Sequence, residues 1–287
     1  MPDLSSVVLK DMKNVLTIDV EEWFQVEALS ESIEQKNWES FKGRLFPTLL
    51  KILSLLKERK VKATFFVLGW VAERFPDLIL MIKQDEHEIA SHGYAHQLVY
   101  QQNKNSFEED VRKSKQILEG ITGEEVIGYR APSFSIVPEC FWAFDVLTKL
   151  GFRYDSSIFP VKHLVYGIPH APRFPFTITL DNGKKIMEFP LSTVRILGFN
   201  FPVAGGGYLR LFPFTYTSWA IRKLNKQGQR AIVYFHPWEI DPHQPKQKAK
   251  FSNRFRHYTN LGIMENRIER LLNDFEFSSI KDIWEMK

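Results

Sequence analysis

The sequence is poor in cysteine: Cys140 is the only one among its 287 residues. An intrachain disulfide and a metal cage built from several thiolates are therefore both excluded. The amino-terminal segment lacks a basic stretch followed by an apolar run of signal-peptide length. No apolar run approaches the roughly 18 residues of a membrane-spanning helix. We therefore expect a cytoplasmic protein with no membrane span.

The chain also has little excess charge of either sign. Its 38 Lys and Arg residues oppose 34 Asp and Glu residues, which gives a formal net charge of +4. No basic run is interleaved with aromatic residues, so we expect no nucleic-acid partner. A hydrophobic fraction of 44% is enough for one large core, and α/β chains of this length are commonly one domain. We expect a single domain over residues 1–287.

Short apolar segments alternate with segments of helical periodicity along the chain. One expected helix, at 46–59, has apolar residues at helical spacing, and another begins at Ser106, which with Glu109 has the spacing of a capping box. Alternation of this kind predicts a mainly parallel sheet, and seven strands favour a barrel. The strands are expected at 15–19, 63–68, 87–91, 126–130, 153–157, 185–191 and 231–236.

Two segments break this alternation. Residues 159–214 are rich in Pro, Gly and aromatic side chains, and residues 237–262 are polar with several Pro and Arg. Both are expected to be long loops near one end of the barrel. Loops of that length inside a compact domain are usually functional, and Tyr166 and Tyr208 are candidates there for stacking on a sugar.

His92 and His96 lie four residues apart in the segment SHGYAH. On a helical turn, positions i and i+4 share one face, so two imidazoles there can bind one transition metal. Zinc sites commonly combine nitrogen ligands with a carboxylate and leave one position for water. The segment TIDVEE, which ends the first expected strand, supplies the acids Asp19, Glu21 and Glu22. The two segments together predict a metal site.

Other polar residues follow the ends of further expected strands. In parallel α/β sheets and barrels the carboxyl ends of the strands meet at one edge, where active sites form. Polar residues scattered over both ends would be expected if they served only the surface. The convergent set is Asp19, His92, His96, Arg130, Asp155 and His236.

In their order along the chain these motifs resemble those of the polysaccharide deacetylases with the NodB homology domain, the carbohydrate esterase family four type. The matching segments are TIDVEE, SHGYAH, YRAPSFS, YDSS and VYFHP, between about residues 13 and 240. The resemblance implies a distorted (β/α) barrel of seven or eight mainly parallel strands. Segments such as GGGYLRLFP and FRHYTNL resemble a bacterial subgroup associated with exosortase and exopolysaccharide loci, which implies a subgroup-specific carboxyl-terminal extension from about residue 198.

The resemblance also implies roles for individual residues. His92 and His96 would bind a divalent metal, most commonly zinc, and Asp19 would be the general base. Many members have two adjacent Asp residues, but here Val20 follows Asp19. We choose Glu21 as the third ligand, because residues i and i+2 of a strand point the same way, and Glu22 remains the alternative.

The remaining catalytic roles follow from the same likeness. Arg130 would orient Asp19 through its planar guanidinium. His236 would be the general acid, with Asp155 as the neighbouring acid that raises its pKa. Aromatic and rigid residues beside the motifs are candidates for substrate binding, namely Trp23, Tyr94, Pro132 and Trp238.

The function expected is metal-dependent removal of N- or O-linked acetyl groups from a bacterial polysaccharide or its precursor. The partner would then be an acetylated polysaccharide or oligosaccharide. Two alternatives remain open. One is a C–N amidohydrolase of a small amide, and the other is a non-catalytic carbohydrate-binding protein.

Overall fold

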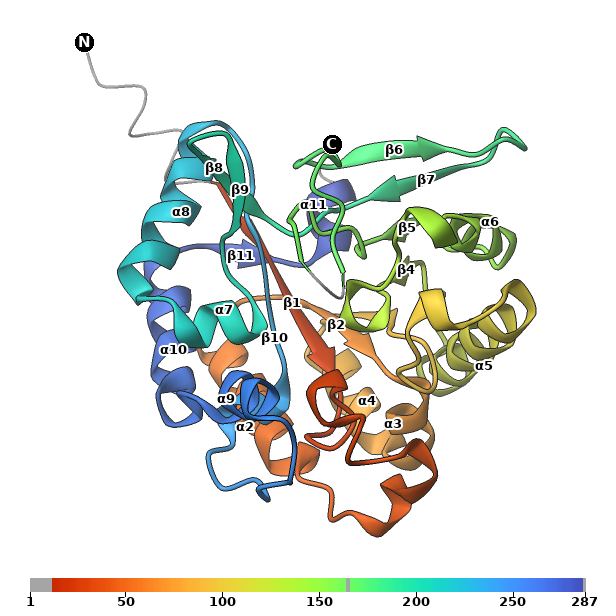
Figure 1. Cartoon of the computed structure of the whole chain (residues 1–287), viewed down its shortest axis with the longest axis horizontal. Helices are drawn as coiled ribbons and strands as arrows, with labels where there is room; N and C mark the ends of the chain where they lie inside the picture. The colour runs from red at the N-terminus through yellow and green to blue at the C-terminus, as the bar shows by residue number, and fades with distance from the viewer. Residues whose placement is uncertain (1–11, 164–165, 286–287) are drawn as a thin grey trace.

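The computed structural model describes residues 12–163 and 166–285. Its centre is a nine-stranded sheet in the order β10-β1-β2-β3-β4-β5-β7-β6, with β11 paired to the start of β1 (Figure 1). The strands are β1 (Asn14–Val20), β2 (Thr64–Val67), β3 (Glu88–Ser91), β4 (Gly128–Tyr129), β5 (Tyr154–Asp155), β6 (Phe176–Thr179), β7 (Lys185–Glu188), β10 (Ile232–Phe235) and β11 (Phe277–Ser278).

The strands pair in parallel except β6 with β7, which form an antiparallel hairpin at one edge. The hydrogen-bonded path of the described strands ends at β10 on one side and β6 on the other. The predicted distorted barrel of mainly parallel strands is therefore confirmed, in the form of a half-barrel.

None of the described helices combines the length and hydropathy needed to cross a membrane. Helices follow most of the parallel strands, as the sequence pattern predicted. The helices are α2 (Leu45–Glu58), α3 (Gly69–Arg74), α4 (Pro76–Gln84), α5 (Lys104–Thr122), α6 (Trp142–Lys149), α7 (Gly206–Leu211), α8 (Phe214–Lys226), α9 (Phe251–Tyr258), α10 (Met264–Asp274) and α11 (Ile280–Glu285).

The two segments expected to be long loops contain regular structure. Residues 159–214 hold β6 and β7, a separate hairpin of β8 (Thr193–Ile196) with β9 (Phe199–Pro202), and α7. Residues 237–262 hold a 3-10 turn at Pro237–Ile240 and then α9. Pro and Gly lie at several of the turns between these short elements, and their abundance concealed β6, β8 and β9, whereas β7 lies within the expected strand at 185–191.

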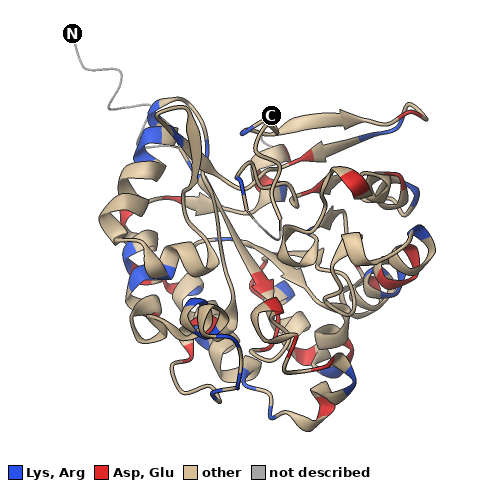
Figure 2. Ribbon diagram, in the orientation of Figure 1, with Lys and Arg blue, Asp and Glu red and all other residues tan. Residues whose placement is uncertain are grey.

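The buried core explains the position of the first acid motif. Every residue of β1 is buried, and so is every residue of β2 beside it. The apolar face of α2 packs on this part of the sheet through Leu49, Ile52 and Leu56. A strand held on both sides has a fixed register, so Asp19 is held at the carboxyl edge of the sheet. Figure 2 shows acidic residues at the end of β1.

Candidate active site

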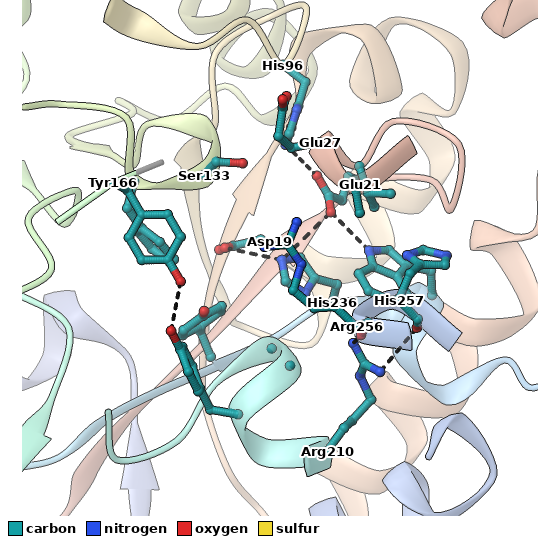
Figure 3. A pocket seen from close by; sticks show the side chains of 18 of the residues that line it. Asp19, Glu21, Glu27, His96, Ser133, Tyr166, Arg210, His236, Arg256 and His257 are labelled. Carbon is teal, nitrogen blue, oxygen red and sulfur yellow. Dashed lines mark hydrogen bonds and ion pairs between the residues drawn. The ribbon is translucent and has the colours of Figure 1, made fainter. Parts of the chain in front are cut away.

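A pocket of about 280 Å³ opens at the carboxyl ends of β1, β3 and β10 (Figure 3). The residues that follow three different strands line it together, which is the convergence the sequence predicted. Its polar lining includes Asp19, Glu21, His92, His96 and His236.

Glu21, His92 and His96 form a cluster whose potential ligand atoms all lie within 4.8 Å of one another. The Nδ1 atom of His92 is 2.8 Å from the carbonyl oxygen of Arg130, which leaves Nε2 for the cluster. Oε1 of Glu21 accepts a hydrogen bond of 2.9 Å from Nε1 of Trp238. Its Oε2 lies 2.7 Å from Nε2 of His96 but has no partner with hydrogen-bond geometry. A buried oxygen left over in this way fits a metal ion, as does the mixed imidazole and carboxylate donor set.

The protonation states also suit metal binding. Burial lowers the pKa of His92 to about 4, so its ring is neutral near pH 7. Burial raises the pKa of Glu21, but the neighbouring His96 and His236 outweigh that effect and lower it to about 2. A neutral imidazole and an ionised carboxylate are the forms that bind a metal.

The two histidines do not share a helical turn, contrary to the expectation from their spacing. The segment after β3 is a loop in which Gly93 has φ 74° and His96 has φ 52°. The carboxylate of Asp110, on α5, accepts hydrogen bonds from the backbone N–H groups of Tyr94 and Ala95. A Cβ at Gly93 would lie 2.8 Å from that carboxylate, so glycine is required there. Asp110 thus positions the loop, and sequence reasoning missed it.

Glu22, the alternative third ligand, lies outside the cluster. Its carboxylate accepts hydrogen bonds from the backbone N–H groups of Arg44 and Leu45, at the start of α2. Unpaired N–H groups at the start of a helix favour an anion. The structure thus gives Glu22 a role in fixing the helix.

Asp19 and Arg130 form a buried ion pair beside the cluster. Nη1 of Arg130 donates to Oδ1 of Asp19 over 2.7 Å and to the hydroxyl of Thr17 over 2.8 Å. The other nitrogens of the guanidinium donate to the backbone and side-chain oxygens of Ser156. One carboxylate oxygen of Asp19 is therefore fixed, while Oδ2 lies 3.8 Å from Nε2 of His236.

His236 is held by Glu239 rather than by Asp155. Its Nδ1 lies 3.0 Å from Oε2 of Glu239, and Nε2 is 3.7 Å from Oε1 of Glu21. Although burial opposes the charged form, Glu21 and Glu239 raise the pKa of His236 to about 9. The expected role of Asp155 as the partner of His236 is thus corrected: the nearby acid is three residues further along, in HPWE.

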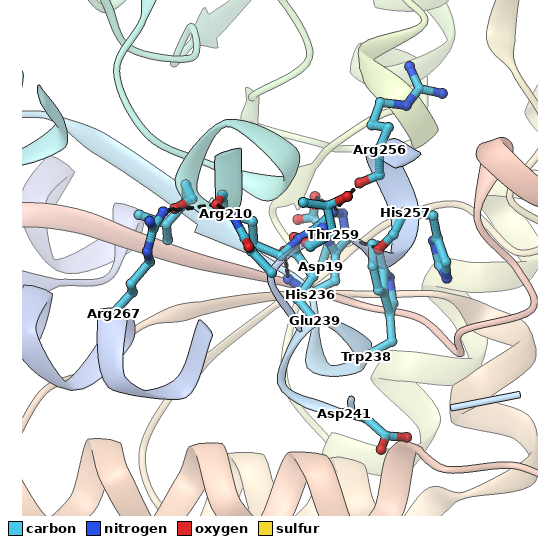
Figure 4. Close-up of polar contacts among 12 residues, drawn as sticks. Asp19, Arg210, His236, Trp238, Glu239, Asp241, Arg256, His257, Thr259 and Arg267 are labelled. Carbon is cyan, nitrogen blue, oxygen red and sulfur yellow. Dashed lines mark hydrogen bonds and ion pairs between the residues drawn. The ribbon is translucent and has the colours of Figure 1, made fainter. Parts of the chain in front are cut away.

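Glu239 is in turn paired with Arg210, which comes from α7 (Figure 4). Nε of Arg210 donates to Oε1 of Glu239 over 2.6 Å, and both side chains are buried. The other nitrogens of Arg210 donate to the carbonyl groups of Arg256, His257 and Thr259. No local signal points to Arg210, because its partners lie almost thirty or more residues away in the chain.

Asp155 has a different position. It accepts hydrogen bonds from the backbone N–H and the hydroxyl of Ser157, and that hydroxyl accepts from the N–H of Ala131. Burial and the charge of Asp155 raise the pKa of Glu188, its neighbour on β7, well above the usual range. Asp155 therefore braces the strand end that carries Arg130, and it is not among the residues that line the pocket.

The predicted substrate-binding residues fall into two groups. Trp238 lines the pocket, where its ring stacks on His236 and on His257. The other three are not among the lining residues. Trp23 is 1% exposed and packs edge-on against two phenylalanines, Tyr94 donates to Glu73, and Pro132 is buried. The prediction that these three residues bind substrate is therefore corrected. Their side chains pack into the core or point away from the pocket.

Tyr166 and Tyr208 were proposed from the loop composition, and both line the pocket. Their hydroxyl groups lie 3.1 Å apart, and Figure 3 shows Tyr166 across the pocket from Asp19 and Glu21. Ser133 and Phe134, which directly follow Pro132, also line it. The segment after β4 therefore contributes Ser133 and Phe134 to the pocket, and not Pro132.

Glu21, His92 and His96 have the donor set of a mononuclear metal centre. Beside them lie the carboxylate of Asp19, whose Oδ2 faces His236, and the imidazole of His236, which is paired with the buried Glu239. These groups together are typical of metal-assisted hydrolases.

Comparison with known families agrees with this class. Residues 47–154 match the family described as polysaccharide deacetylase, and residues 156–285 match a domain of unknown function, DUF3473. The chain thus contains a polysaccharide deacetylase domain of the NodB, carbohydrate esterase family four type, joined to a DUF3473 region. The first match includes His92, His96 and Arg130, whereas His236 lies in the second.

Similar proteins have been described in bacteria. The chain is 38% identical over 73 residues to a peptidoglycan-N-acetylglucosamine deacetylase of Bacillus cereus, covering 25% of this chain and 26% of that protein. It is 31% identical over 113 residues to a peptidoglycan deacetylase of Helicobacter pylori, covering 38% of this chain and 36% of that protein. The chain thus spans about a quarter to a third of the length of these relatives.

The fold is shared with a solved structure over nearly the whole chain. A protein of Mycobacterium smegmatis, named as a candidate polysaccharide deacetylase, superposes with a TM-score of 0.62 at 19% identity. The superposition covers 96% of this chain and 91% of that one. At this identity the likeness concerns the fold, so the chemistry must be argued from the residues of the site.

Proposed function

We propose that this protein is a metal-dependent deacetylase that hydrolyses N- or O-linked acetyl groups of a bacterial polysaccharide or its precursor. The observation that carries the proposal is the cluster of Glu21, His92 and His96, with Asp19 and His236 beside it in one pocket. The resemblance of the carboxyl-terminal segments to an exosortase-associated subgroup supports an exopolysaccharide as the substrate.

The cluster would hold one divalent cation, and zinc is our choice because imidazole and carboxylate ligands suit it. When bound, such an ion is a Lewis acid that acidifies a water molecule and polarises the acetyl carbonyl. His92 is oriented for this role by its contact with the carbonyl of Arg130. A hydrogen bond from a ligating histidine to a backbone carbonyl fixes both the tautomer and the ring orientation.

In this proposal Asp19 accepts the proton of the attacking water. Arg130 holds Oδ1 of Asp19, and the other oxygen, Oδ2, lies on the side of His236. General base catalysis requires a positioned acceptor of this kind. Asn in place of Asp19 would keep the shape of the side chain but could not take the proton.

In this proposal His236 donates a proton to the leaving nitrogen or oxygen of the sugar. Nδ1 lies beside Glu239, and Nε2 is the atom that faces Asp19 and Glu21. The pKa of about 9 keeps the ring protonated at neutral pH. Glu239 and Arg210 therefore act through His236, as an orienting pair.

The test is acetate release measured together with metal content. The zinc-loaded protein should release acetate from N-acetylglucosamine oligomers or from O-acetylated xylan, and Asp19→Asn should retain zinc but lose most turnover. General acid–base groups typically contribute about 100- to 10,000-fold. Asp181→Asn, at an exposed turn, is the matched control and should behave as wild type.

Other outcomes would select the alternatives. Bound zinc with release of an amine or ammonia from small amides, and no acetate, would indicate a C–N amidohydrolase. Glycan binding with neither zinc nor acetate release would indicate a non-catalytic carbohydrate-binding protein. Either result would overturn the proposal.

A further inference from the structure

The β8–β9 hairpin exposes an apolar face that the proposed hydrolytic site does not use. Leu197 is 93% exposed, Phe199 71% and Phe201 40%. Phe199 and Phe201 are two residues apart on β9 and share one face of the hairpin, and Leu197 lies in its turn. Asn200, on the other face, donates to the carbonyl groups of Pro160 and Pro169 and holds the hairpin against the body of the protein. Val194, which pairs with Phe201, is buried, so the exposed apolar part of the hairpin is its tip, from Leu197 to Phe201.

The turn of this hairpin is unusual in sequence. Ile196 pairs with Phe199, so Leu197 and Gly198 form a two-residue turn, with φ angles of 48° and 86°. Such turns favour Asn or Asp followed by Gly. A leucine in the left-handed region is uncommon and costs conformational energy. A large apolar side chain is therefore kept at the exposed tip where a small polar one would fit the backbone better.

Basic residues surround the apolar face. Trp219 on α8 is 45% exposed, and the ammonium group of Lys223 lies 4.9 Å from the centre of its ring. Lys223 also donates to the carbonyl of Arg195 on β8, which joins the hairpin to the helix. Beside them is a groove of about 620 Å³ whose charged lining consists of Arg222, Lys223, Lys226, Arg270 and Asp274. Asp274 lies 3.8 Å from Arg222, so cations predominate.

The sequence around this face is free of acids. Residues 189–238 contain no Asp or Glu, but they contain six Lys and Arg. One of the six, Arg210, is buried against Glu239 and does not belong to this face. Figure 2 shows Lys and Arg on α8 beside the hairpin. This distribution contrasts with the almost balanced charge of the whole chain.

We propose that the hairpin tip and the basic face of α8 together form a docking surface for an anionic lipid bilayer. Leu197 and Phe199 would enter the boundary between headgroups and acyl chains, and Trp219 would lie at the headgroup level. Lys223, Lys226 and Arg222 would face the lipid phosphates. A second copy of this chain is disfavoured as the occupant, because two surfaces of like charge would meet. A soluble acidic glycan is also disfavoured, because it would not bury the exposed side chain of Leu197.

The position of the surface leaves the proposed active site open. Asn225, near the end of α8, is hydrogen-bonded to Asn14 at the start of β1. The hairpin and this end of α8 therefore lie toward the amino ends of the strands, whereas the pocket lies at their carboxyl ends (Figure 1). Docking would hold the protein at a bilayer with its pocket accessible to a glycan.

The test is sedimentation with vesicles of phosphatidylcholine alone or mixed with phosphatidylglycerol. The full chain should bind the mixed vesicles, more weakly as salt is raised. Leu197→Asn with Phe199→Thr should weaken the partition coefficient about tenfold or more, since two apolar groups no longer enter the bilayer. Asn suits the turn and Thr suits a strand, so this variant should fold at least as well as wild type.

Charge and position have their own variants. Lys223→Gln with Lys226→Gln should lower binding to mixed vesicles by about tenfold or more and flatten its salt dependence. Phe251→Ser, which removes an 84% exposed apolar side chain on α9, and Lys57→Gln, on α2, are matched controls that should bind as wild type.

Four results would overturn the proposal. They are no binding to mixed vesicles, equal binding by the hairpin variant, binding of alginate in place of vesicles, and self-association that the hairpin variant abolishes. Acetate release in solution should be unchanged in all these variants, so failure of this proposal is distinguishable from failure of the proposed function.

Discussion

At the scale of single residues, the first acid motif shows what alternation along a strand can predict. Asp19 and Glu21 reach the same pocket, while Glu22 turns to the start of α2. The choice of Glu21 over Glu22 thus agrees with the geometry, because side chains two residues apart point the same way. It remains a prediction of metal binding, which the following experiment tests.

Glu21→Gln should weaken zinc binding about tenfold or more, because it replaces a charged ligand by a neutral amide. Glu22→Gln should leave zinc affinity unchanged but lower the free energy of unfolding by about 1 kcal/mol, because Glu22 caps the first N–H groups of α2. Zinc titration calorimetry and thermal denaturation separate the two effects. The reverse order of zinc affinities would contradict our assignment.

His236→Ala should keep bound zinc but reduce kcat about 100- to 10,000-fold, because the proton donor is lost. Added imidazole should restore part of the activity. Glu239→Gln should fall between this variant and wild type, because the histidine remains but its orienting acid is neutral. A loss of less than about threefold in His236→Ala would reject the role of general acid.

Residue-scale reasoning was weakest for contacts that depend on the path of the backbone. Asp155 was chosen as the partner of His236, but the turn after β10 brings Glu239 back to it. The spacing in HPWE was visible in the sequence, whereas the contact of Glu239 with Arg210 depends on how α7 packs. The prediction that Trp23 binds substrate was wrong for another reason: an aromatic side chain suits a buried core position and a binding position equally well.

At the scale of helices and strands, buried parallel strands were predictable and local backbone geometry was not. β1, β2, β3 and β10 follow the expected apolar segments closely. The start of α5 was expected at Ser106, but the N-cap residue is Asn103. Ser106 is at position N3 and completes the capping box with Asn103. β7 lies within the expected strand at 185–191, but its partner β6 and the hairpin β8–β9 were missed, because these strands are partly exposed and lack a continuous apolar run.

The junction of β2 with β3 predicts a dependence of stability on pH. His87 is buried against Phe65, and its Nδ1 accepts a hydrogen bond from the N–H of Ala63. Burial, and then the charge of Lys62, lowers its pKa from 6.5 to about 4. In the unfolded chain the imidazole of His87 becomes protonated as the pH falls below 6.5, whereas in the folded protein it stays neutral until about pH 4. This contribution to stability is present above pH 6.5 and is lost as the pH falls through that window.

His87→Asn should remove that dependence, since Asn can accept the same hydrogen bond but does not titrate. Wild type should lose up to about 1.4 kcal/mol per pH unit more than the variant across this window. Urea denaturation at a series of pH values measures the difference, with His170→Asn, at an exposed position, as control. Parallel curves for wild type and His87→Asn would exclude the effect.

At the scale of the whole molecule, the site joins three parts of the chain: β1, which precedes both family matches, the match at 47–154 and the match at 156–285. The metal cluster and Arg130 come from β1, β3 and β4, whereas His236 and Glu239 follow β10 and Arg210 lies on α7. Because β10 pairs directly with β1, these parts belong to one sheet. Binding at the cluster should therefore stabilise the whole cooperative unit, not one loop.

Zinc should accordingly raise the melting temperature of the intact protein. A ligand at about 100 times its Kd stabilises the folded state by about 2.7 kcal/mol, which for a chain of this size corresponds to about 5 °C. In His92→Ala or His96→Ala the shift should vanish, because one of three ligands is missing. His170→Ala, an exposed histidine outside the pocket, should keep the full shift. Calorimetric scans in zinc and in chelator measure these shifts, and an equal rise in the cluster variants would place the zinc elsewhere on the protein.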